Sequence, residues 1–540
     1  MAETISPTGE RTVLQIRATG KASKDFAVLF HKDPRDKSKL LENRRKLGLP
    51  EQNEGVLVIY TGGTIGSAPK DPEDPRSPQV VKPWPELAEA VPALSSTSPQ
   101  AISFRIDAVA FEDPLDSSNM GPMEWNAVAK LLKKYMDSYE GFVIAHGTDT
   151  MVYSASALSF MLVNLKKPVI LTGSQLSAIG HVRNDAQQNL ITAILIANAK
   201  YSQIPNVPEV CIFFRDKLLR GNRAIKIDAT GYVAYETHNV KELGTAGASI
   251  SINKELLLKP NDKDFDVHEK LDTNVINLGV FPGIQDREML KSILNTQGLK
   301  AVVLRTFGAG NTATNPDFLR QLEVAKEKGI VVVNVTQCAR GTVQMGLYET
   351  SAVLMKYGVI SGIDITAEAA LTKLMVLLGD ERMGPGEVPR LAQENLRGEQ
   401  SESIFVTPMR QGEVVTLAKG NPSHWFLTEE KIRHLEKPVR HAVLILHSAT
   451  IRPAGEEDRL DINIYINVSQ EEDLVPHHPK LACAASRLKM EDGTLVFNVT
   501  EAIRHHLDAE LRNSFTVQLG GSGEGELVWS SGELALYAEA

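Results

Sequence analysis

The sequence has few cysteines, no long apolar run and no excess of positive charge. Its three cysteines, Cys211, Cys338 and Cys483, form neither a disulfide framework nor a Cys-x-x-Cys metal motif. No stretch approaches the roughly 18 apolar residues of a membrane-spanning helix, and the N-terminal region has no apolar segment typical of a secretion signal. We therefore expect a cytoplasmic protein with no membrane partner.

The charge balance argues against another class of partner. The chain has 58 Lys and Arg against 67 Asp and Glu, for a formal net charge of −9. Nucleic-acid-binding proteins concentrate Lys and Arg, so we expect no nucleic-acid partner. The 42% apolar residues are too many for a disordered chain, and 540 residues suit several domains.

From about residue 54 to residue 380, short apolar runs alternate with longer amphipathic stretches, a pattern typical of parallel-sheet α/β proteins. The predicted strands are Gly55–Tyr60, Phe142–His146, Val169–Thr172, Glu209–Phe214, Ala301–Thr306 and Ile330–Thr336. The predicted helices are Pro122–Tyr139, Tyr153–Asn164, Asn184–Ala199, Pro316–Lys328 and Thr366–Leu378. An Asp-rich linker at 259–273 would separate a larger α/β domain, 54–258, from a smaller one, 274–402.

Different patterns flank this α/β region. Residues 1–53 are interpreted as an N-terminal extension with a hairpin of Thr12–Arg17 and Asp25–Phe30. A connector at 403–435 leads to residues 436–540, where short apolar runs are separated by Gly, Asn and Ser turns. This last pattern predicts an antiparallel β-sandwich. The fold class is thus two α/β domains followed by an all-β module.

Hydroxyl residues and glycines follow three of the predicted strands. The segments are Thr61-Gly62-Gly63-Thr64, His146-Gly147-Thr148-Asp149-Thr150 and Thr172-Gly173-Ser174-Gln175. Ligands bind beyond the carboxyl ends of parallel strands, so these segments should meet at one edge. Taken alone, each is explained by a tight turn or a helix cap. Together they offer a nucleophilic hydroxyl, backbone N–H groups and a carboxylate, which acyl transfer requires.

Two other chemistries are disfavoured by missing motifs. The sequence lacks Gly-x-x-x-x-Gly-Lys-Ser/Thr and Gly-x-Gly-x-x-Gly, so a nucleotide site is not expected. It also lacks Gly-x-Ser-x-Gly, which argues against a Ser-His-Asp triad. Threonine or lysine chemistry is favoured instead.

Three segments resemble the signatures of the bacterial-type L-asparaginases, particularly the cytoplasmic type I branch. They are Thr61–Gly66, His146–Met151 and Arg220–Lys226, and the likeness continues in order from about residue 54 to 402. The resemblance implies an amidohydrolase that converts L-asparagine to aspartate and ammonia without metal or organic cofactor. It also implies a homodimer or homotetramer, whose active sites form between subunits.

The resemblance also implies roles for individual residues. Thr64 would attack the amide to form an acyl-enzyme, and Lys226 would activate Thr148 beside Asp149. The residues that would contact the substrate are Gly63, Ser117, Ser118, Gly147 and Asn311.

The chain departs from the family pattern in two places. The segment Ser67–Pro83 contains five prolines and lacks the tyrosine that many members carry there, so Tyr348 is the candidate for the missing phenol. A regulatory asparagine site would involve Arg305, Thr336 and Cys338, but Ile225 stands where that site has a hydroxyl residue.

The sequence is compatible with three alternatives to an asparaginase. A glutaminase pocket differs by one methylene, worth about 1–3 kcal/mol, which sequence does not resolve. A tRNA-dependent amidotransferase subunit shares the resemblance but should have a basic RNA-binding surface. A binding or scaffolding protein that has lost the activity is the alternative outside enzymology; the intact Thr64, Thr148 and Lys226 argue against it.

Overall fold

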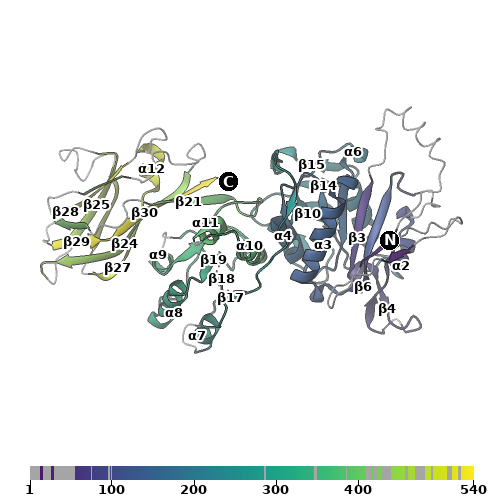
Figure 1. Ribbon diagram of the computed structural model, residues 1–540, viewed down its shortest axis with the longest axis horizontal. Coiled ribbons are helices and arrows are strands. Elements are labelled where there is room, and N and C mark those ends of the chain that lie inside the picture. The colour runs from purple at the N-terminus through teal and green to yellow at the C-terminus, as the bar shows by residue number, and fades with distance from the viewer. Residues whose placement is uncertain are drawn as a thin grey trace. The chain divides into compact units, whose positions relative to one another are not determined.

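The computed structural model describes most of the chain. The described residues are 13–15, 26–29, 55–74, 76–94, 98, 100–284, 288–345, 349–384, 386–408, 415–418, 423–426, 439–455, 460–468, 481–487, 490–506, 514–520 and 525–539. They form two compact units (Figure 1). The first unit contains residues 1–273, 378–381 and 397–399, and the second contains 274–377, 382–396 and 400–540.

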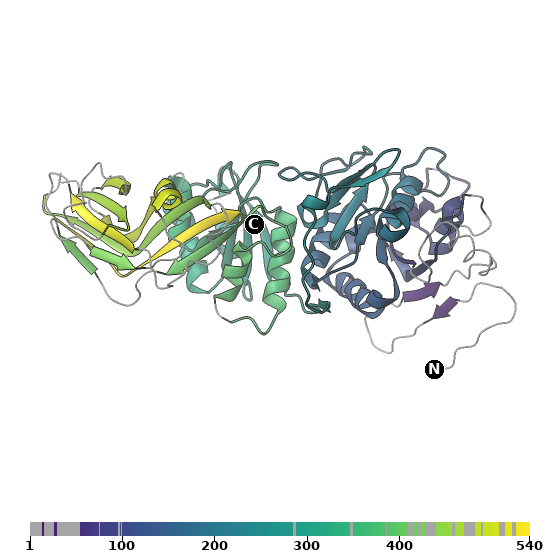
Figure 2. The same ribbon diagram turned by 90° about the horizontal axis from the view of Figure 1, so that it is seen from above.

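The first unit is built on a mixed sheet, which has ten strands in the described residues. Their order is β1-β2-β6-β3-β7-β9-β10-β11-β14-β15, and the central strands β6, β3, β7, β9 and β10 run parallel. The bounds are β1 Val13–Gln15, β2 Phe26–Leu29, β3 Val56–Gly62, β6 Ile106–Leu115, β7 Gly141–Ala145, β9 Val169–Thr172, β10 Val210–Phe214, β11 Lys217–Arg220, β14 Gly244–Ala246 and β15 Ile250–Ile252. The expected N-terminal hairpin is confirmed, because β1 pairs antiparallel with β2 at the edge of this sheet (Figure 2).

Helices cover both faces of the central strands. β3 is buried along its whole length, which explains its continuous apolar run. Its residues Val56, Val58 and Tyr60 share one core with α2 (Trp84–Ala90) and α5 (Ala186–Ala197). Two further helices, α3 (Pro122–Tyr135) and α4 (Met151–Met161), pack together beside the sheet (Figure 1).

The second unit begins with a smaller parallel sheet. Its order is β17-β18-β19-β20, and all of its neighbours run parallel. The strands are β17 Val275–Gly279, β18 Ala301–Thr306, β19 Val331–Thr336 and β20 Val359–Ser361. The helices are α7 Glu288–Leu294, α8 Pro316–Glu327, α9 Glu349–Lys356, α10 Ala367–Gly379 and α11 Glu387–Gln393.

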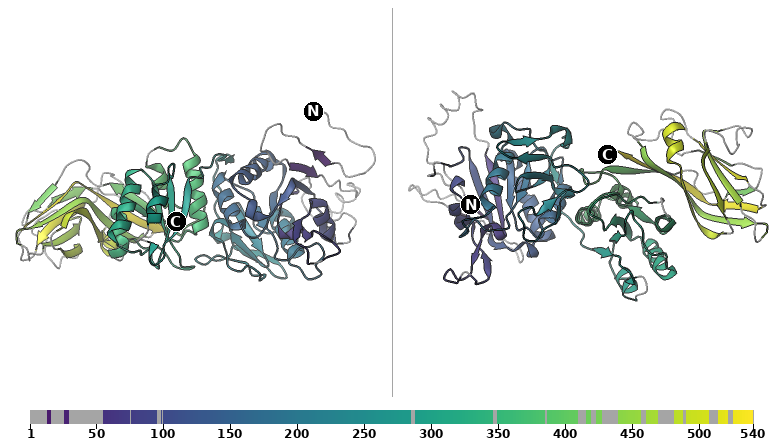
Figure 3. Two further views of the ribbon diagram at one scale, coloured as in Figure 1. Left: turned by 90° about the horizontal axis from the view of Figure 1, so that it is seen from below. Right: turned by 180° about the vertical axis from the view of Figure 1, so that it is seen from behind.

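Two antiparallel sheets follow in the same unit, as expected from the turn-rich C-terminal sequence (Figure 3). One contains β21 Glu402–Pro408, β22 Val415–Ala418, β24 Val439–Pro453, β27 Met490–Asn498, β29 Gly525–Trp529 and β30 Ser531–Glu539; the other contains β23 Ser423–Phe426, β25 Leu460–Ile466, β26 Leu481–Arg487 and β28 Ser514–Gly520. Both contribute to one apolar core, and α12 (Thr500–His506) packs against it. Three of these strands lie before residue 436, so we use "β-module" for residues 402–539.

The β-module shares a second core with the smaller α/β domain. We call this group the junction core; it contains Ile363, Ile404, Val443, Ile445, Ala535 and Tyr537. Alternate residues of β24 enter the two cores: Val443 and Ile445 face the junction, whereas Leu444 faces the β-module interior. Ile363 is 2% exposed and has a φ of 58°, a left-handed conformation that is rare for a β-branched residue.

Candidate active site

The loops after β3, β6 and β7 meet in backbone contact. Gly63, with a φ of 88°, is so close to the next loop that an added Cβ would lie 2.3 Å from both N and Cα of Gly147. A Cβ on Gly147 would in turn lie 2.7 Å from Cβ of Ser117. Only glycine fits such approaches. On the other side, a Cβ on Gly173 would lie 2.4 Å from the His146 carbonyl oxygen. The three segments predicted to meet at the sheet edge, Thr61–Thr64, His146–Thr150 and Thr172–Gln175, therefore do so.

Lys226 joins this group from a distant part of the chain. Its Nζ donates a hydrogen bond to Thr148 Oγ1 at 3.0 Å and another to Asp149 Oδ1 at 2.6 Å. The Lys226 side chain is 17% exposed and the Asp149 side chain 63% exposed. A shielded ammonium thus contacts a hydroxyl, while the carboxylate that balances its charge faces solvent.

A two-stranded ribbon positions Lys226 and also holds the Thr148 backbone. Lys226 on β12 (Ile225–Lys226) lies directly opposite Tyr235 on β13 (Tyr235–Glu236). The Tyr235 hydroxyl donates a short hydrogen bond to the Thr148 carbonyl. Burial, followed by the nearby Asp149 charge, raises the Tyr235 pKa well above its ordinary value.

Tyr235 is an additional candidate site residue, which no sequence motif singled out. The sequence Asp228-Ala-Thr-Gly231 was a signal for the ribbon. In the fold, Asp228 Oδ1 accepts hydrogen bonds from the backbone N–H groups of Thr230 and Gly231. An Asp followed by glycine in this spacing is typical of a turn between strands. The turn predicts a hairpin, and the hairpin places Tyr235 beside Lys226.

Ser117 and Ser118 lie at the same edge, after β6. The Ser117 hydroxyl accepts a hydrogen bond from the Asp149 N–H at 3.2 Å, and the Ser117 carbonyl accepts one from the Thr150 hydroxyl at 2.6 Å. The Ser118 N–H donates to Asp116 Oδ1 at 2.8 Å. Hydrogen bonds therefore connect the Ser117 loop with the loop that carries Thr148 and Asp149.

Thr64 lies at the start of a short 3₁₀ turn, Thr64–Gly66, and is half-buried. Its carbonyl accepts a hydrogen bond from the Ser67 hydroxyl at 3.0 Å. Its own hydroxyl has no hydrogen-bond partner among the described residues. The proline-rich segment that follows forms a hairpin of β4 (Ser67–Pro69) and β5 (Gln79–Val81).

The remaining candidate residues belong to the second unit. Asn311 Oδ1 accepts a hydrogen bond from the Thr350 hydroxyl at 2.8 Å. Arg305 and Thr336 lie near the carboxyl ends of the neighbouring strands β18 and β19. The Thr336 hydroxyl donates a hydrogen bond to the Gly308 carbonyl at 2.6 Å and accepts one from the Cys338 N–H at 3.0 Å. Cys338 is exposed. Tyr348 lies outside the described residues.

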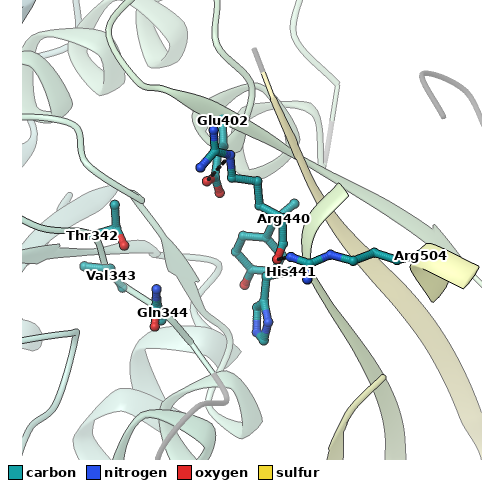
Figure 4. Close-up of a pocket in the computed structure, with 8 residues that line it drawn as sticks. Thr342, Val343, Gln344, Glu402, Arg440, His441 and Arg504 are labelled. Atoms are coloured by element: carbon teal, nitrogen blue, oxygen red, sulfur yellow. Dashed lines mark hydrogen bonds and ion pairs between the residues drawn. The ribbon is translucent and has the colours of Figure 1, made fainter. Parts of the chain in front are cut away.

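A separate cavity of about 330 Å³ lies within the second unit, between the β-module and the smaller α/β domain. Figure 4 shows Thr342, Val343 and Gln344 on one side and His441 with two arginines on the other. The two ring nitrogens of His441 are hydrogen-bonded, Nδ1 with the Thr500 hydroxyl at 3.0 Å and Nε2 with the Met345 carbonyl at 3.3 Å. Burial lowers the His441 pKa. The cavity borders the junction core, because Tyr537 belongs to both, and polar side chains line much of it.

Two other kinds of feature are absent from the described residues. They contain no cluster of His, Cys, Asp and Glu suited to a metal ion. No helix among them is long and apolar enough to cross a membrane.

Comparison with known proteins gives these geometries a context. The family model "Asparaginase, N-terminal" matches residues 55–258, and "Glutaminase/Asparaginase C-terminal domain" matches 274–391. The chain is 40% identical to L-asparaginase 1 of Escherichia coli K12 over 64% of this chain and 98% of that one. The crystal structure of L-asparaginase I from Vibrio cholerae aligns with a TM-score of 0.56 at 36% identity, covering 65% of this chain and 100% of that chain.

A longer relative matches the same part of the chain. The 60 kDa lysophospholipase of Homo sapiens is 43% identical over 64% of this chain and 61% of its own length, so the match spans less than two thirds of that protein. The bacterial enzyme, by contrast, is matched almost from end to end. Because two family models and this complete relative coincide with the two α/β domains, the chain belongs to the asparaginase family.

Proposed function

We propose that the protein is an L-asparagine amidohydrolase that works through a threonine acyl-enzyme. The observation that carries the proposal is the contact of Lys226 Nζ with both Thr148 Oγ1 and Asp149 Oδ1, from a position 77 or 78 residues away. A shielded cation beside a hydroxyl favours loss of the hydroxyl proton, which a nucleophilic or proton-transferring threonine needs.

In the proposed reaction, Thr64 Oγ1 attacks the side-chain amide carbon of asparagine. The hydroxyl proton leaves through a neighbouring base, and the amide nitrogen gains a proton and departs as ammonia. The resulting aspartyl ester is then hydrolysed by water, which restores the threonine. Thr148 and Lys226 are assigned to proton transfer, and Tyr348 remains the candidate for a catalytic phenol.

Substrate binding is assigned to the polar groups around this pair. Ser117 and Ser118 would hold the α-carboxylate, and the exposed Asp149 carboxylate suits the α-ammonium. Gly63 and Gly147 complete the contacts proposed within this unit. Asn311 is proposed, on the family resemblance, to reach the substrate from a second copy of the chain. The regulatory asparagine site at Arg305, Thr336 and Cys338 also remains a proposal, which a sigmoidal dependence of rate on asparagine concentration would support.

The decisive experiment measures ammonia release from asparagine. We expect Thr64→Ala, Thr148→Ala and Lys226→Met each to lower kcat by about 100-fold or more. Lys133→Met is the matched control, because Lys133 is a half-exposed lysine paired with Asp266. Undiminished activity in any of the first three variants would remove that residue from the mechanism. A parallel series with glutamine decides between the two amides.

A second candidate activity, lysophospholipid hydrolysis, is favoured by the human relative of that name. The chemistry is compatible, because an acyl-enzyme forms from an ester as well as from an amide. Lysophosphatidylcholine hydrolysis by the wild type, abolished by Thr64→Ala, would support it. Ammonia release without fatty-acid release would exclude it.

Assembly as a homodimer or homotetramer is also proposed, on the family resemblance. The molecular mass in solution tests it, and a monomer with full activity would refute it. Copurification of RNA or of a second polypeptide would instead favour an amidotransferase subunit.

A further inference from the structure

Behind the Thr148 loop, three buried side chains form a linear series of hydrogen bonds. Trp125 Nε1 on α3 lies 2.8 Å from Ser154 Oγ on α4, and Ser154 Oγ lies 2.8 Å from His146 Nε2. His146 Nδ1 lies 2.6 Å from the Gly147 carbonyl oxygen. The side chains of Trp125, Ser154 and His146 are 5%, 1% and 0% exposed. We call them the His146 series.

The two ends of the series and the charge of the imidazole together fix the direction of every hydrogen bond. The Trp125 indole N–H can only donate, and the Gly147 carbonyl can only accept. His146 Nδ1 must therefore carry a proton. Burial lowers the His146 pKa to about 4, so the ring is neutral and Nε2 accepts from the Ser154 hydroxyl. Each donor and acceptor of the series thus has one partner, with a single imidazole tautomer.

The series ends on a peptide group of the candidate active site. The peptide between Gly147 and Thr148 is planar, so fixing its carbonyl also fixes the Thr148 N–H on the opposite side. That N–H has no hydrogen-bond partner among the described residues. The other two polar groups of Thr148 are held separately, the carbonyl by Tyr235 and the hydroxyl by Lys226.

We propose that His146 is a positioning residue for the amide hydrolysis: its imidazole, oriented by Ser154 and Trp125, sets the Gly147–Thr148 peptide and thereby aims the Thr148 hydroxyl and N–H. The proposal rests on the function proposed above. Close backbone packing of Gly147 against Gly63 makes a small rotation of this peptide costly, and a misplacement of about 1 Å at a reacting group can cost about 100-fold in rate.

A buried histidine that only fills space would behave differently. Its loss would lower stability but would not separate kcat from KM in the folded protein. The two roles are distinguished by keeping or removing one hydrogen bond. Asparagine places its Nδ2 where imidazole has Nδ1, so His146→Asn keeps a donor for the Gly147 carbonyl. His146→Leu has similar bulk and removes it.

The first experiment compares the kinetics of these variants with asparagine as substrate. We expect His146→Leu to lower kcat by about 30- to 100-fold with KM changed by less than about threefold, and His146→Asn to recover most of the loss. Ser154→Ala and Trp125→Phe should lower kcat by smaller factors. The matched controls are Ser159→Ala, whose hydroxyl bonds only within α4, and Trp84→Phe on α2.

Equal kcat in the Leu and Asn variants, or a control variant as impaired as Ser154→Ala, would overturn the proposal. If His146→Leu does not fold, the Ser154 and Trp125 variants carry the comparison. A purely structural role predicts lower thermal stability with unchanged kcat per folded molecule, and this result would also overturn it.

A second experiment does not depend on activity. Hydrogen exchange of the backbone amides at 147–150 is measured without substrate. We expect faster exchange in His146→Leu and near wild-type exchange in His146→Asn. Unchanged exchange in His146→Leu would refute the positioning role even in an active enzyme. Conversely, a wild type that releases no ammonia would refute the proposed function, while the exchange result would still decide whether His146 holds this loop.

Discussion

The edge of the large sheet and the junction core are assembled by different means. At the sheet edge, the loops of Gly63 and Gly147 touch through backbone atoms, and the Ser117 side chain packs against Gly147 and accepts a hydrogen bond from the Asp149 N–H. At the junction, apolar side chains of the β-module and the smaller α/β domain interdigitate, and polar groups remain at the rim. The contacts at the sheet edge fix the positions of the loops, whereas those at the junction stabilise the second unit by burying apolar surface. Substitutions should therefore have different effects in the two regions.

The largest effect is expected where backbone contact excludes any side chain. Gly63→Ala would place a Cβ 2.3 Å from Gly147 backbone atoms at a φ of 88°. We expect a loss of about 4 kcal/mol or more in the free energy of unfolding. Gly180→Ala is the control, since Gly180 has a φ of 76° but no atom within 4 Å of an added Cβ. Similar urea midpoints for the two variants would show that the contact is unimportant.

Removing side-chain volume at the junction should cost somewhat less. Ile445 is 4% exposed in the junction core, and Ile445→Ala should lower the free energy of unfolding of the second unit by about 3 kcal/mol. Val496→Ala, at a partly buried neighbour of this core, should cost about 1 kcal/mol. Urea unfolding followed by tryptophan fluorescence measures both. Equal losses would mean that burial does not organise the junction.

The buried His146 should make the sheet edge sensitive to acid. An unfolded histidine binds a proton near its ordinary pKa of 6.5, whereas folded His146 does so only near 4. Its stabilising contribution is thus complete above pH 6.5 and is lost as the pH falls toward 4, by about 2 kcal/mol between roughly pH 7 and pH 5. His146→Asn should lose less stability over that interval. A wild type and variant with parallel pH profiles would contradict this.

The smallest effect is expected outside both regions. Lys133 and Asp266 form an ion pair at 2.9 Å with side chains 46% and 63% exposed. Lys133→Ala should change the free energy of unfolding by less than about 1 kcal/mol and leave kcat unchanged. A larger loss would show that this exposed ion pair contributes to stability on the same scale as the backbone contacts and the buried core.

Strands β3, β7, β9, β10, β18 and β19 were predictable because their apolar runs are continuous. β6 escaped prediction because Asp107 interrupts its pattern. In the fold this carboxylate is 2% exposed and accepts a hydrogen bond from Tyr139, 32 residues away, at 2.7 Å. No local pattern reveals such a distant partner. The hydrogen bond from Tyr235 to the Thr148 carbonyl is hidden for the same reason, because it joins residues 87 apart. The turn signal places Tyr235 beside Lys226 but does not place the ribbon over Thr148.

For the site, strand ends carrying Thr64, Thr148 and Thr172 could be brought to one edge by topology alone. Ser117 follows β6, which was not predicted, so its place in the site came only from resemblance. The approach of Lys226 came only from resemblance, because an isolated lysine has no pattern. The C-terminal sequence held a further signal. Ala442–Leu446 is a continuous apolar run rather than an alternating one, which indicates a strand covered on both faces, as β24 is by the two cores.

The left-handed backbone at Ile363 has a consequence for how attachment of the β-module can be measured. In the full chain, burial in the junction core and a 2.7 Å hydrogen bond from the Val343 N–H to its carbonyl hold this residue in place, so Ile363→Gly should destabilise the protein. In a chain ending before β21, the same side chain would lose its apolar cover but keep its backbone strain, and glycine should then stabilise it. Residue 363 would thus act as a thermodynamic reporter whose sign reveals whether the β-module is docked.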